Sequence, residues 1–214
     1  MGKKSLVLCL SFFYLLIVWG VYRFYTDFSE PWDELVFKPL LWLGMIIFLV
    51  LRLEKRKLRS LGIVFKKPLK NIFLGLGVGI LITSQYLFAL AIKGGRIMFN
   101  PQNLKLTNLF LYFFVCLSTA AVEEITFRGF FMTRINEIIK NKLNANIMAG
   151  LIFFLIHLPI LLLDYQLGLR GIGEYFILSL GLGIIDGYVF WKTKGVLAPI
   201  ASHFFLNYLN LFLG

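Results

Sequence analysis

Long apolar runs are the feature that most restricts how this chain of 214 residues can fold. A membrane-spanning helix needs about 20 mostly apolar residues, with a range of roughly 17–25. Runs of approximately this length occur at Ser5–Tyr22, Val36–Leu51, Asn71–Ile92, Thr107–Val122, Asn146–Leu163, Ile172–Trp191 and Val196–Leu213. Because lipid offers no hydrogen-bond partner to an exposed backbone, each run is expected to be a continuous helix. The sequence therefore predicts an all-α, polytopic transmembrane bundle of about seven spans.

The overall composition excludes the soluble alternatives. Hydrophobic residues make up 59% of the chain and charged residues 15%, whereas a typical soluble domain carries roughly 25% charged residues. A disordered chain would be poorer in apolar and aromatic residues. In a soluble protein the net charge of +11 would suggest nucleic acid, but here we expect it in membrane loops and predict no nucleic-acid partner. We expect one integral membrane domain over residues 1–214, with N-terminal spans in 1–106 and a core in 107–214.

The positions of Lys and Arg give the expected orientation in the lipid bilayer. With a cytoplasmic N-terminus, sixteen of the 22 basic residues fall in cytoplasmic segments and six in outer segments. Cytoplasmic segments of membrane proteins carry an excess of Lys and Arg. We therefore expect a protein of a bacterial cell membrane with its N-terminus inside and its C-terminus outside.

One lysine stands close to the start of the second apolar run. Lys38 directly precedes Pro39, and a lysine near a helix end can extend its ammonium group to the membrane surface. The proline suits a first helical turn. We therefore expect Lys38 to reach the membrane surface.

The fourth run is short for a span unless its helix continues through the charged residues after Val122, where two adjacent carboxylates, Glu123 and Glu124, follow. Ionisable residues at membrane depth commonly cost ~2.5–3.5 kcal/mol each on insertion scales, so a functional role is the first hypothesis. Arg128 lies four residues after Glu124 and shares its helix face in the favourable acid-first order, while Glu123 points about 100° away. Arg128 can thus neutralise Glu124 and leave Glu123 available as a general base. The alternative is a charged helix end at the membrane surface.

Both histidines of the chain lie inside apolar runs. His157 follows Phe153 by four residues, and His203 precedes Asn207 by four residues, so each pair shares a helix face. A histidine in this setting can be a structural hydrogen-bond donor, and His203 with Asn207 can be an interhelical hydrogen-bonding pair. Alternatively, His203 is a ligand or base beside an amide that stabilises an oxyanion.

A further carboxylate, Asp186, lies inside the sixth run. Small residues spaced for close helix packing occur in two runs, at Gly75 and Gly79 and at Gly183 and Gly187. We expect Asp186 to be a buried structural partner, with Arg128 as the candidate counter-ion, rather than a catalytic residue.

The predicted topology places the polar residues at similar depths. Glu123 lies at the cytoplasmic end of the fourth span, His157 about 11 residues into the fifth and His203 about 7 residues into the seventh, counted from inside at 1.5 Å per residue. We therefore expect these side chains in the inner half of the bilayer, around a cavity that opens to the cytoplasm.

The three motifs Glu-Glu-x-x-x-Arg, Phe-x-x-x-His and His-x-x-x-Asn, in this order on successive membrane helices, resemble the CPBP family. These are the CAAX prenyl proteases and the bacteriocin-processing or self-immunity proteins, also called Abi proteins. The motif residues here are Glu123, Glu124, Arg128, Phe153, His157, His203 and Asn207. The resemblance covers roughly residues 109–213.

The resemblance implies an intramembrane endopeptidase. In the family, the residues matched by Glu123 and His157 activate a water molecule. Those matched by His203 and Asn207 stabilise the tetrahedral oxyanion. Glu124 and Arg128 match supporting positions.

Metal dependence stays open at this point. The family is widely labelled as metalloprotease, so zinc is a candidate cofactor, with Glu123, His157 and His203 as candidate ligands and an open position for water. The chain has no His-Glu-x-x-His motif, however. A glutamate–histidine pair can also activate water without a metal.

The expected partner is a membrane-associated peptide, such as a bacteriocin or pheromone precursor, or a regulatory membrane protein. One alternative is a non-enzymatic bacteriocin self-immunity or membrane regulatory protein that uses the same bundle as a binding scaffold. Another is a small transporter or proton relay. The complete set of motif residues favours the protease, because an unused intramembrane pair of glutamates is costly.

Overall fold

The first half of the chain forms three helical rods in the computed structural model, which describes residues 2–92, 105–163 and 165–212. The first rod consists of α1 (Lys3–Tyr14), η1 (Leu15–Trp19) and α2 (Gly20–Tyr25). The second consists of α3 (Glu30–Trp32), η2 (Asp33–Phe37), η3 (Pro39–Leu43), α4 (Gly44–Phe48) and η4 (Leu49–Leu53). After the 3₁₀ turn η5 (Leu58–Leu61), the third rod is α5 (Pro68–Ile92). The segments η1 to η4 are π-helical turns within otherwise continuous rods.

The second half of the chain forms four further rods. The first is α6 (Leu106–Glu124), which continues through the π-helical segment η7 (Ile125–Met132) into α7 (Thr133–Ile139). It is followed by α8 (Lys142–Leu163), α9 (Leu169–Thr193) and α10 (Leu197–Asn210). Every regular element of the described residues is therefore helical, and the predicted all-α membrane bundle is confirmed.

Five of these rods are long and apolar enough to cross a membrane. They are Lys4–Tyr25, Glu30–Leu53, Leu106–Ile139, Lys142–Leu163 and Leu169–Thr193. The other two are α5, with 25 residues, and α10, with 14 residues. At 1.5 Å per residue α10 is shorter than the hydrocarbon core of about 30 Å. Each of the seven predicted runs corresponds to one rod, although the expected end of the last run at Leu213 lies outside the described residues.

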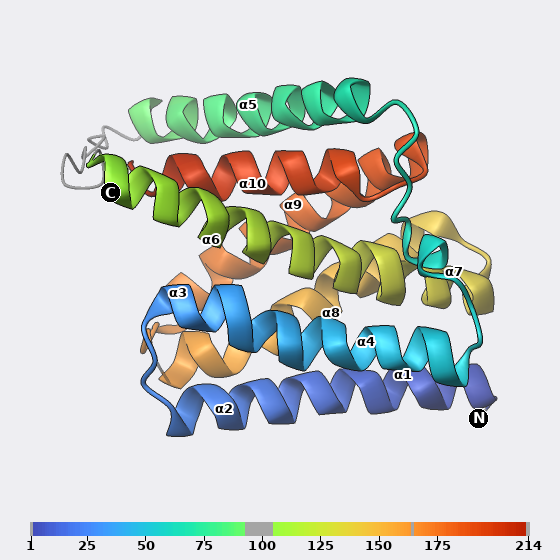
Figure 1. The fold of residues 1–214 in the computed structure, drawn as a ribbon. Coiled ribbons are helices and arrows are strands. Elements are labelled where there is room, and N and C mark those ends of the chain that lie inside the picture. The colour runs from blue at the N-terminus through green and yellow to red at the C-terminus, as the bar shows by residue number, and fades with distance from the viewer. Residues whose placement is uncertain (1, 93–104, 164, 213–214) are drawn as a thin grey trace.

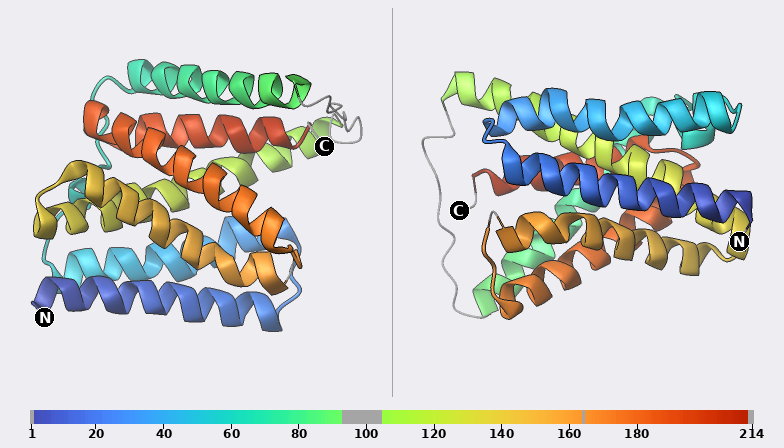
Figure 2. Two further views of the ribbon diagram at one scale, coloured as in Figure 1. Left: turned by 180° about the vertical axis from the view of Figure 1, so that it is seen from behind. Right: turned by 90° about the horizontal axis from the view of Figure 1, so that it is seen from below.

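The rods run approximately along one direction, so the bundle has two ends (Figure 1). The basic end holds the N-terminus and the connections at residues 54–67, 140–141 and 194–196. The distal end holds the connection at residues 26–29, the residues that precede α9, and the C-terminal end of α10. α5 and α10 lie side by side, and α8 packs against α9 on the side that is seen from behind in Figure 2.

Close helix packing occurs at the glycines that the sequence singled out. A Cβ atom on Gly75 of α5 would lie 2.1 Å from the carbonyl oxygen of Ala198 in α10. A Cβ atom on Gly187 of α9 would lie 1.9 Å from Oδ1 of Asn146 in α8. Both contacts leave no room for a larger residue, so the predicted small-residue interfaces are confirmed. They hold α10 and α9 close to their neighbours and thereby position the side chains described next.

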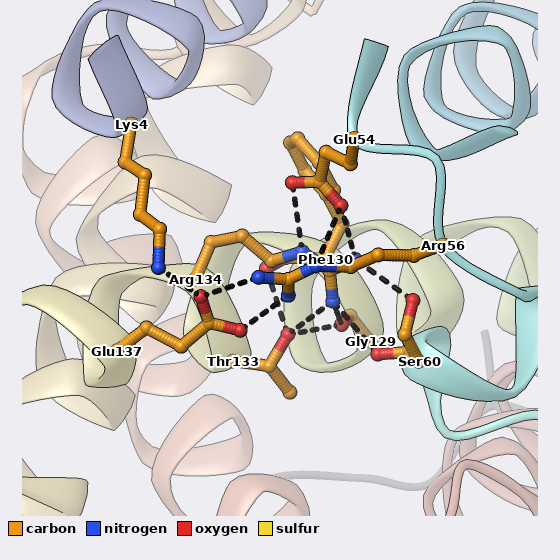
Figure 3. A network of polar contacts seen from close by, with 9 residues as sticks. All are labelled: Lys4, Glu54, Arg56, Ser60, Gly129, Phe130, Thr133, Arg134 and Glu137. Carbon is orange, nitrogen blue, oxygen red and sulfur yellow. Dashed lines mark hydrogen bonds and ion pairs between the residues drawn. The ribbon is translucent and has the colours of Figure 1, made fainter. Parts of the chain in front are cut away.

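A network of charged side chains ties the rods together at the basic end (Figure 3). Arg134 of α7 donates to Oε2 of Glu54 at 2.6 Å and to the carbonyl oxygen of Ser60 at 2.7 Å. Arg56 donates to both carboxylate oxygens of Glu137, at 2.5 and 3.0 Å. These contacts attach the connection before α5 to the end of α7.

Candidate active site

The predicted catalytic side chains meet around one cavity of about 750 Å³. Glu123 comes from the last turn of α6, His157 from α8, and His203 and Asn207 from α10. All four line the cavity. They converge because α6 packs against α10 on one side and against the second rod on the other. The shared space that the sequence predicted is therefore present.

The carboxylate of Glu123 lies at the centre of this group, and the residue is only 3% exposed. Its Oε1 accepts a hydrogen bond from Nζ of Lys38 at 2.6 Å and lies 3.5 Å from Nε2 of His157. Its Oε2 lies 3.6 Å from Nε2 of His203. One buried carboxylate is thus surrounded by three basic side chains from three different rods.

The partners of the Nδ1 atoms fix the tautomer of each imidazole. Nδ1 of His157 lies 2.8 Å from the carbonyl oxygen of Phe153, which can only accept, so Nδ1 carries the proton. Nδ1 of His203 lies 2.9 Å from Oε1 of Glu124, and by the same logic it donates to an ionised carboxylate. In the neutral form both rings therefore point an Nε2 lone pair toward Glu123. Both can take up a proton there, or donate one when charged.

Phe153, the first residue of the Phe-x-x-x-His motif, contacts His157 in two ways. Its carbonyl oxygen accepts the Nδ1 proton, and its ring centroid lies 4.4 Å from that of His157. Phe153 is itself buried against Phe127, with the ring centroids 4.8 Å apart. The orientation of the imidazole is therefore set by backbone and packing together.

Glu124 and Arg128 form the predicted ion pair. Nη1 of Arg128 lies 2.9 Å from Oε1 of Glu124, and the two residues are 4% and 0% exposed. The same carboxylate oxygen receives the Nδ1 proton of His203. Glu124 therefore holds His203 in place from behind, while Glu123 faces the cavity.

Asp186 is buried beside this pair, as expected. It is 1% exposed and, with Arg128 and His203, lines a small cavity of about 30 Å³. A cavity of this size can hold one water molecule. Oδ1 of Asp186 has no hydrogen-bond partner among the described residues. The direct ion pair with Arg128 stays a prediction, although the two side chains share this cavity.

Lys38 is the site residue that the sequence interpretation missed, since it was expected at the membrane surface. It is 3% exposed, and its ammonium group binds Glu34 at 2.9 Å as well as Glu123. Its Nζ lies 5.7 Å and 5.2 Å from the ring centroids of Trp19 and Trp42. The ammonium turns inward because the buried carboxylate of Glu123 and the partly buried carboxylate of Glu34 attract it more strongly than the surface. The acid-first spacing of Glu34 and Lys38 was the available signal.

The predicted depths also need correction. Glu123 was placed at the inner end of a span, but the helix continues to Ile139, so Glu123 lies near the middle of a span of 34 residues. α8 begins at Lys142 rather than Asn146, which moves His157 further from the basic end. The helix does not end at Glu124: Oε1 of Glu124 accepts a hydrogen bond from Nδ1 of His203, and Arg134 further along the helix binds Glu54 and Ser60.

The cavity extends from Glu123 to the distal end of the bundle. Its lining reaches Glu30, Tyr165 and Asn210 there. The N-terminus and the basic connections lie at the other end (Figure 1). The sequence predicted both a cytoplasmic N-terminus and a cavity open to the cytoplasm. Because the N-terminus and the cavity mouth lie at opposite ends of the bundle, these two predictions are incompatible.

The side chains as they stand do not form a metal centre. Among the described residues, no group of three or more His, Cys, Asp or Glu side chains is placed to hold a metal ion. The positive charge next to Glu123 is the ammonium of Lys38. Binding of zinc by Glu123, His157 and His203 stays a prediction.

A buried glutamate between two histidines, inside a bundle of apolar helices, defines a class: membrane proteins equipped for acid–base chemistry within the bilayer. Residues 105–209 match the family described as type II CAAX prenyl endopeptidase, Rce1-like. Residues 105–209 therefore form a domain of this family, and the resemblance seen in the motifs is confirmed. Membership implies a protease that acts on a peptide or protein. Neither a curated protein nor a solved structure matches the chain.

Proposed function

We propose that this protein is an intramembrane endopeptidase in which Glu123 and His157 activate a water molecule. The observation that carries the proposal is the position of the Glu123 carboxylate, within 3.5 Å of one imidazole and 3.6 Å of another, at the wall of a buried cavity. Burial in apolar surroundings strengthens each of these electrostatic interactions. The family match supplies independent support for peptide hydrolysis.

The chemistry follows from the acceptors that face the cavity. A water molecule beside Glu123 can donate one proton to the carboxylate and a hydrogen bond to Nε2 of His157. Its oxygen then attacks the carbonyl carbon of the peptide bond and gives a tetrahedral oxyanion. When the carbon–nitrogen bond breaks, the proton held by Glu123 passes to the leaving amine. The products are one new carboxyl group and one new amino group.

Asn207 and His203 are the proposed donors to the oxyanion. Both lie on α10 one turn apart and line the same cavity. The amide of Asn207 can donate directly. Because Nδ1 of His203 already donates to Glu124, Nε2 can donate to the oxyanion only in the charged imidazolium form. Donors aimed at the developing negative charge are commonly the largest single contribution to such catalysis.

Lys38 supplies the charge that permits a carboxylate at this depth. A buried carboxylate without a counter-charge is strongly unfavourable, and Lys38 lies 2.6 Å from Oε1 of Glu123. Oε2, which lies 3.6 Å from Nε2 of His203, is thereby left for the water. We assign Lys38 a positioning role rather than a direct part in the reaction.

The proposed substrate is a membrane-associated peptide or a membrane protein. The purified protein, in detergent or lipid vesicles, would be incubated with a pool of synthetic apolar peptides, and new termini would be read by mass spectrometry. We expect new termini with the parent protein and with Glu174→Gln, a control on an exposed glutamate whose side chain is 63% exposed. We expect none with Glu123→Gln.

The main alternative is a non-enzymatic immunity or regulatory protein on the same scaffold. It would be favoured if the parent protein protected cells against a bacteriocin while no peptide in any pool was cleaved. It would also be favoured if Glu123→Gln protected cells as well as the parent, because a scaffold does not need a general base.

A further inference from the structure

The cavity has its mouth at the distal end of the bundle. From Glu123 its lining continues along α8, α9 and α10 to residues that are exposed there, among them Glu30, Tyr165 and Asn210. Tyr165 is 64% exposed, although it lines the same cavity as the buried Glu123. A continuous path therefore joins the site to the distal surface.

The basic end is closed by packed side chains. Directly beyond Glu124, the residues Phe127, Phe130, Phe131 and Met132 are all 0% exposed. Beyond them lies the network around Arg134, Glu54 and Glu137, which binds α7 to the connection before α5 (Figure 3). None of these residues lines the cavity. Peptide cannot reach the site from this end without unpacking the core.

The two ends differ in charge as well. Residues 52–70, which include this connection and the adjoining helix ends, carry eight Lys and Arg residues, and the N-terminus and the other basic connections add more. The segments toward the distal end hold six basic residues in the sequence against sixteen for the others, and Arg23 and Arg170 among the six are paired with Asp33 and Glu174. Segments rich in Lys and Arg face the cytoplasm. The closed end is therefore the cytoplasmic end.

We propose that the active-site cavity opens to the non-cytoplasmic side of the membrane and takes its substrate from there. The substrate would then be a peptide already exported across the membrane, or the outer juxtamembrane segment of a membrane protein. A soluble cytoplasmic peptide would meet the closed end. The statement about substrate rests on the proposed peptidase function, whereas the position of the cavity mouth does not.

Cysteine labelling tests the orientation without any need for activity. In a background with Cys9→Ala and Cys116→Ala, single cysteines would be introduced at the mouth as Asn210→Cys or Tyr165→Cys. Lys57→Cys at the basic end is the matched control, because Lys57 is also exposed. Each variant would be treated with a membrane-impermeant maleimide in right-side-out and in inverted vesicles from bacterial cells.

We expect the two mouth cysteines to react in right-side-out vesicles and to lose that labelling in inverted vesicles, with the opposite result for Lys57→Cys. The reverse pattern would overturn the proposal and return the cavity to the cytoplasmic side. Labelling of every cysteine in both preparations, or of the mouth cysteines in neither, would overturn it too. Because catalysis is not measured, a failure here is distinct from a failure of the peptidase function.

In a second step, peptide cleavage would be measured before and after labelling. Attachment of the maleimide to Asn210→Cys should abolish cleavage, whereas attachment to Lys57→Cys should leave it unchanged. Cleavage that persists at the parent rate after complete labelling at both mouth positions would contradict entry of substrate through this mouth. The labelling pattern itself would stand unaffected by that result.

Discussion

Replacing Lys38 with Met would remove the ammonium group that lies 2.6 Å from Glu123 and 2.9 Å from Glu34. Met keeps an unbranched apolar stem of similar length, so the loss is mainly one of charge. The side chains of Glu123 and Glu34 are 4% and 15% exposed. Removal of one partner from a buried ion pair typically costs about 3–5 kcal/mol. Most of this cost should come from Glu123, because Glu34 is more exposed and keeps a hydrogen bond from Thr119.

Thermal unfolding of the purified protein in detergent would measure the effect. For chains of 150–250 residues, 1 kcal/mol shifts the midpoint by roughly 2–4 °C, so Lys38→Met should lower it by at least about 6 °C. Lys57→Met, on an exposed lysine, should leave it unchanged. Lys38→Arg keeps the charge and should recover part of the loss.

A second substitution would show where the penalty arises. The double variant Lys38→Met with Glu123→Gln leaves no charge stranded at Glu123, so it should unfold at a higher temperature than Lys38→Met alone. Coupling of this kind between contacting residues usually amounts to about 0.5–3 kcal/mol. An unfolding midpoint of Lys38→Met equal to that of the parent would refute the assignment of Lys38 as the counter-charge. So would a double variant that is less stable than either single one.

Three further results are expected. Arg128→Lys should lower the yield of folded protein together with activity, because Lys lacks the planar guanidinium that lies 2.9 Å from Glu124. A normal yield with only weaker substrate binding would indicate a substrate contact instead. Gly75→Ala should lower the unfolding temperature, because the new Cβ would lie 2.1 Å from a backbone oxygen of Ala198, whereas Gly77→Ala, which meets nothing within 4 Å, should not. Incubation with a zinc chelator should leave peptide cleavage unchanged, because an ammonium group rather than a metal neutralises the central glutamate; a loss of cleavage that added zinc restores would contradict this expectation.

Local patterns predicted much of this structure from the sequence. Each apolar run corresponds to a helical rod, because a backbone in lipid has no other way to satisfy its hydrogen bonds. The spacing of four residues correctly paired Glu124 with Arg128. The same spacing placed His203 and Asn207 on one face of α10, and both line the cavity.

Contacts between distant segments could not be predicted in this way. Lys38 and Glu123 are 85 residues apart, and no local spacing connects them. The general tendency of lysines near helix ends to reach the surface led to the wrong expectation, because it ignores a buried carboxylate on another helix. Lys38 also lies outside the residues that match the family, so the motifs gave no indication of it.

The sequence left the continuation of α6 past Glu124 open for a related reason. Charged residues after an apolar run resemble the end of a membrane helix. Here Oε1 of Glu124 lies against both Arg128 and His203, and the helix proceeds as the π-helical segment η7, a form often found at functional sites. The depth of the site, and with it the end at which the cavity opens, depended on this continuation.

The central claim is that Glu123, and not Glu124, takes the proton from the attacking water. The most direct measurement is the turnover of one cleaved peptide by the parent, by Glu123→Gln and by Glu124→Gln, beside the unfolding temperature of each. We predict that Glu123→Gln folds, retains Glu34 as a partner for Lys38, and loses about 10²–10⁴-fold in turnover, the usual cost of losing a general base. Glu124→Gln should instead lose mainly stability. Turnover of Glu123→Gln at the parent rate, with Glu124→Gln folded and inactive, would contradict the assignment.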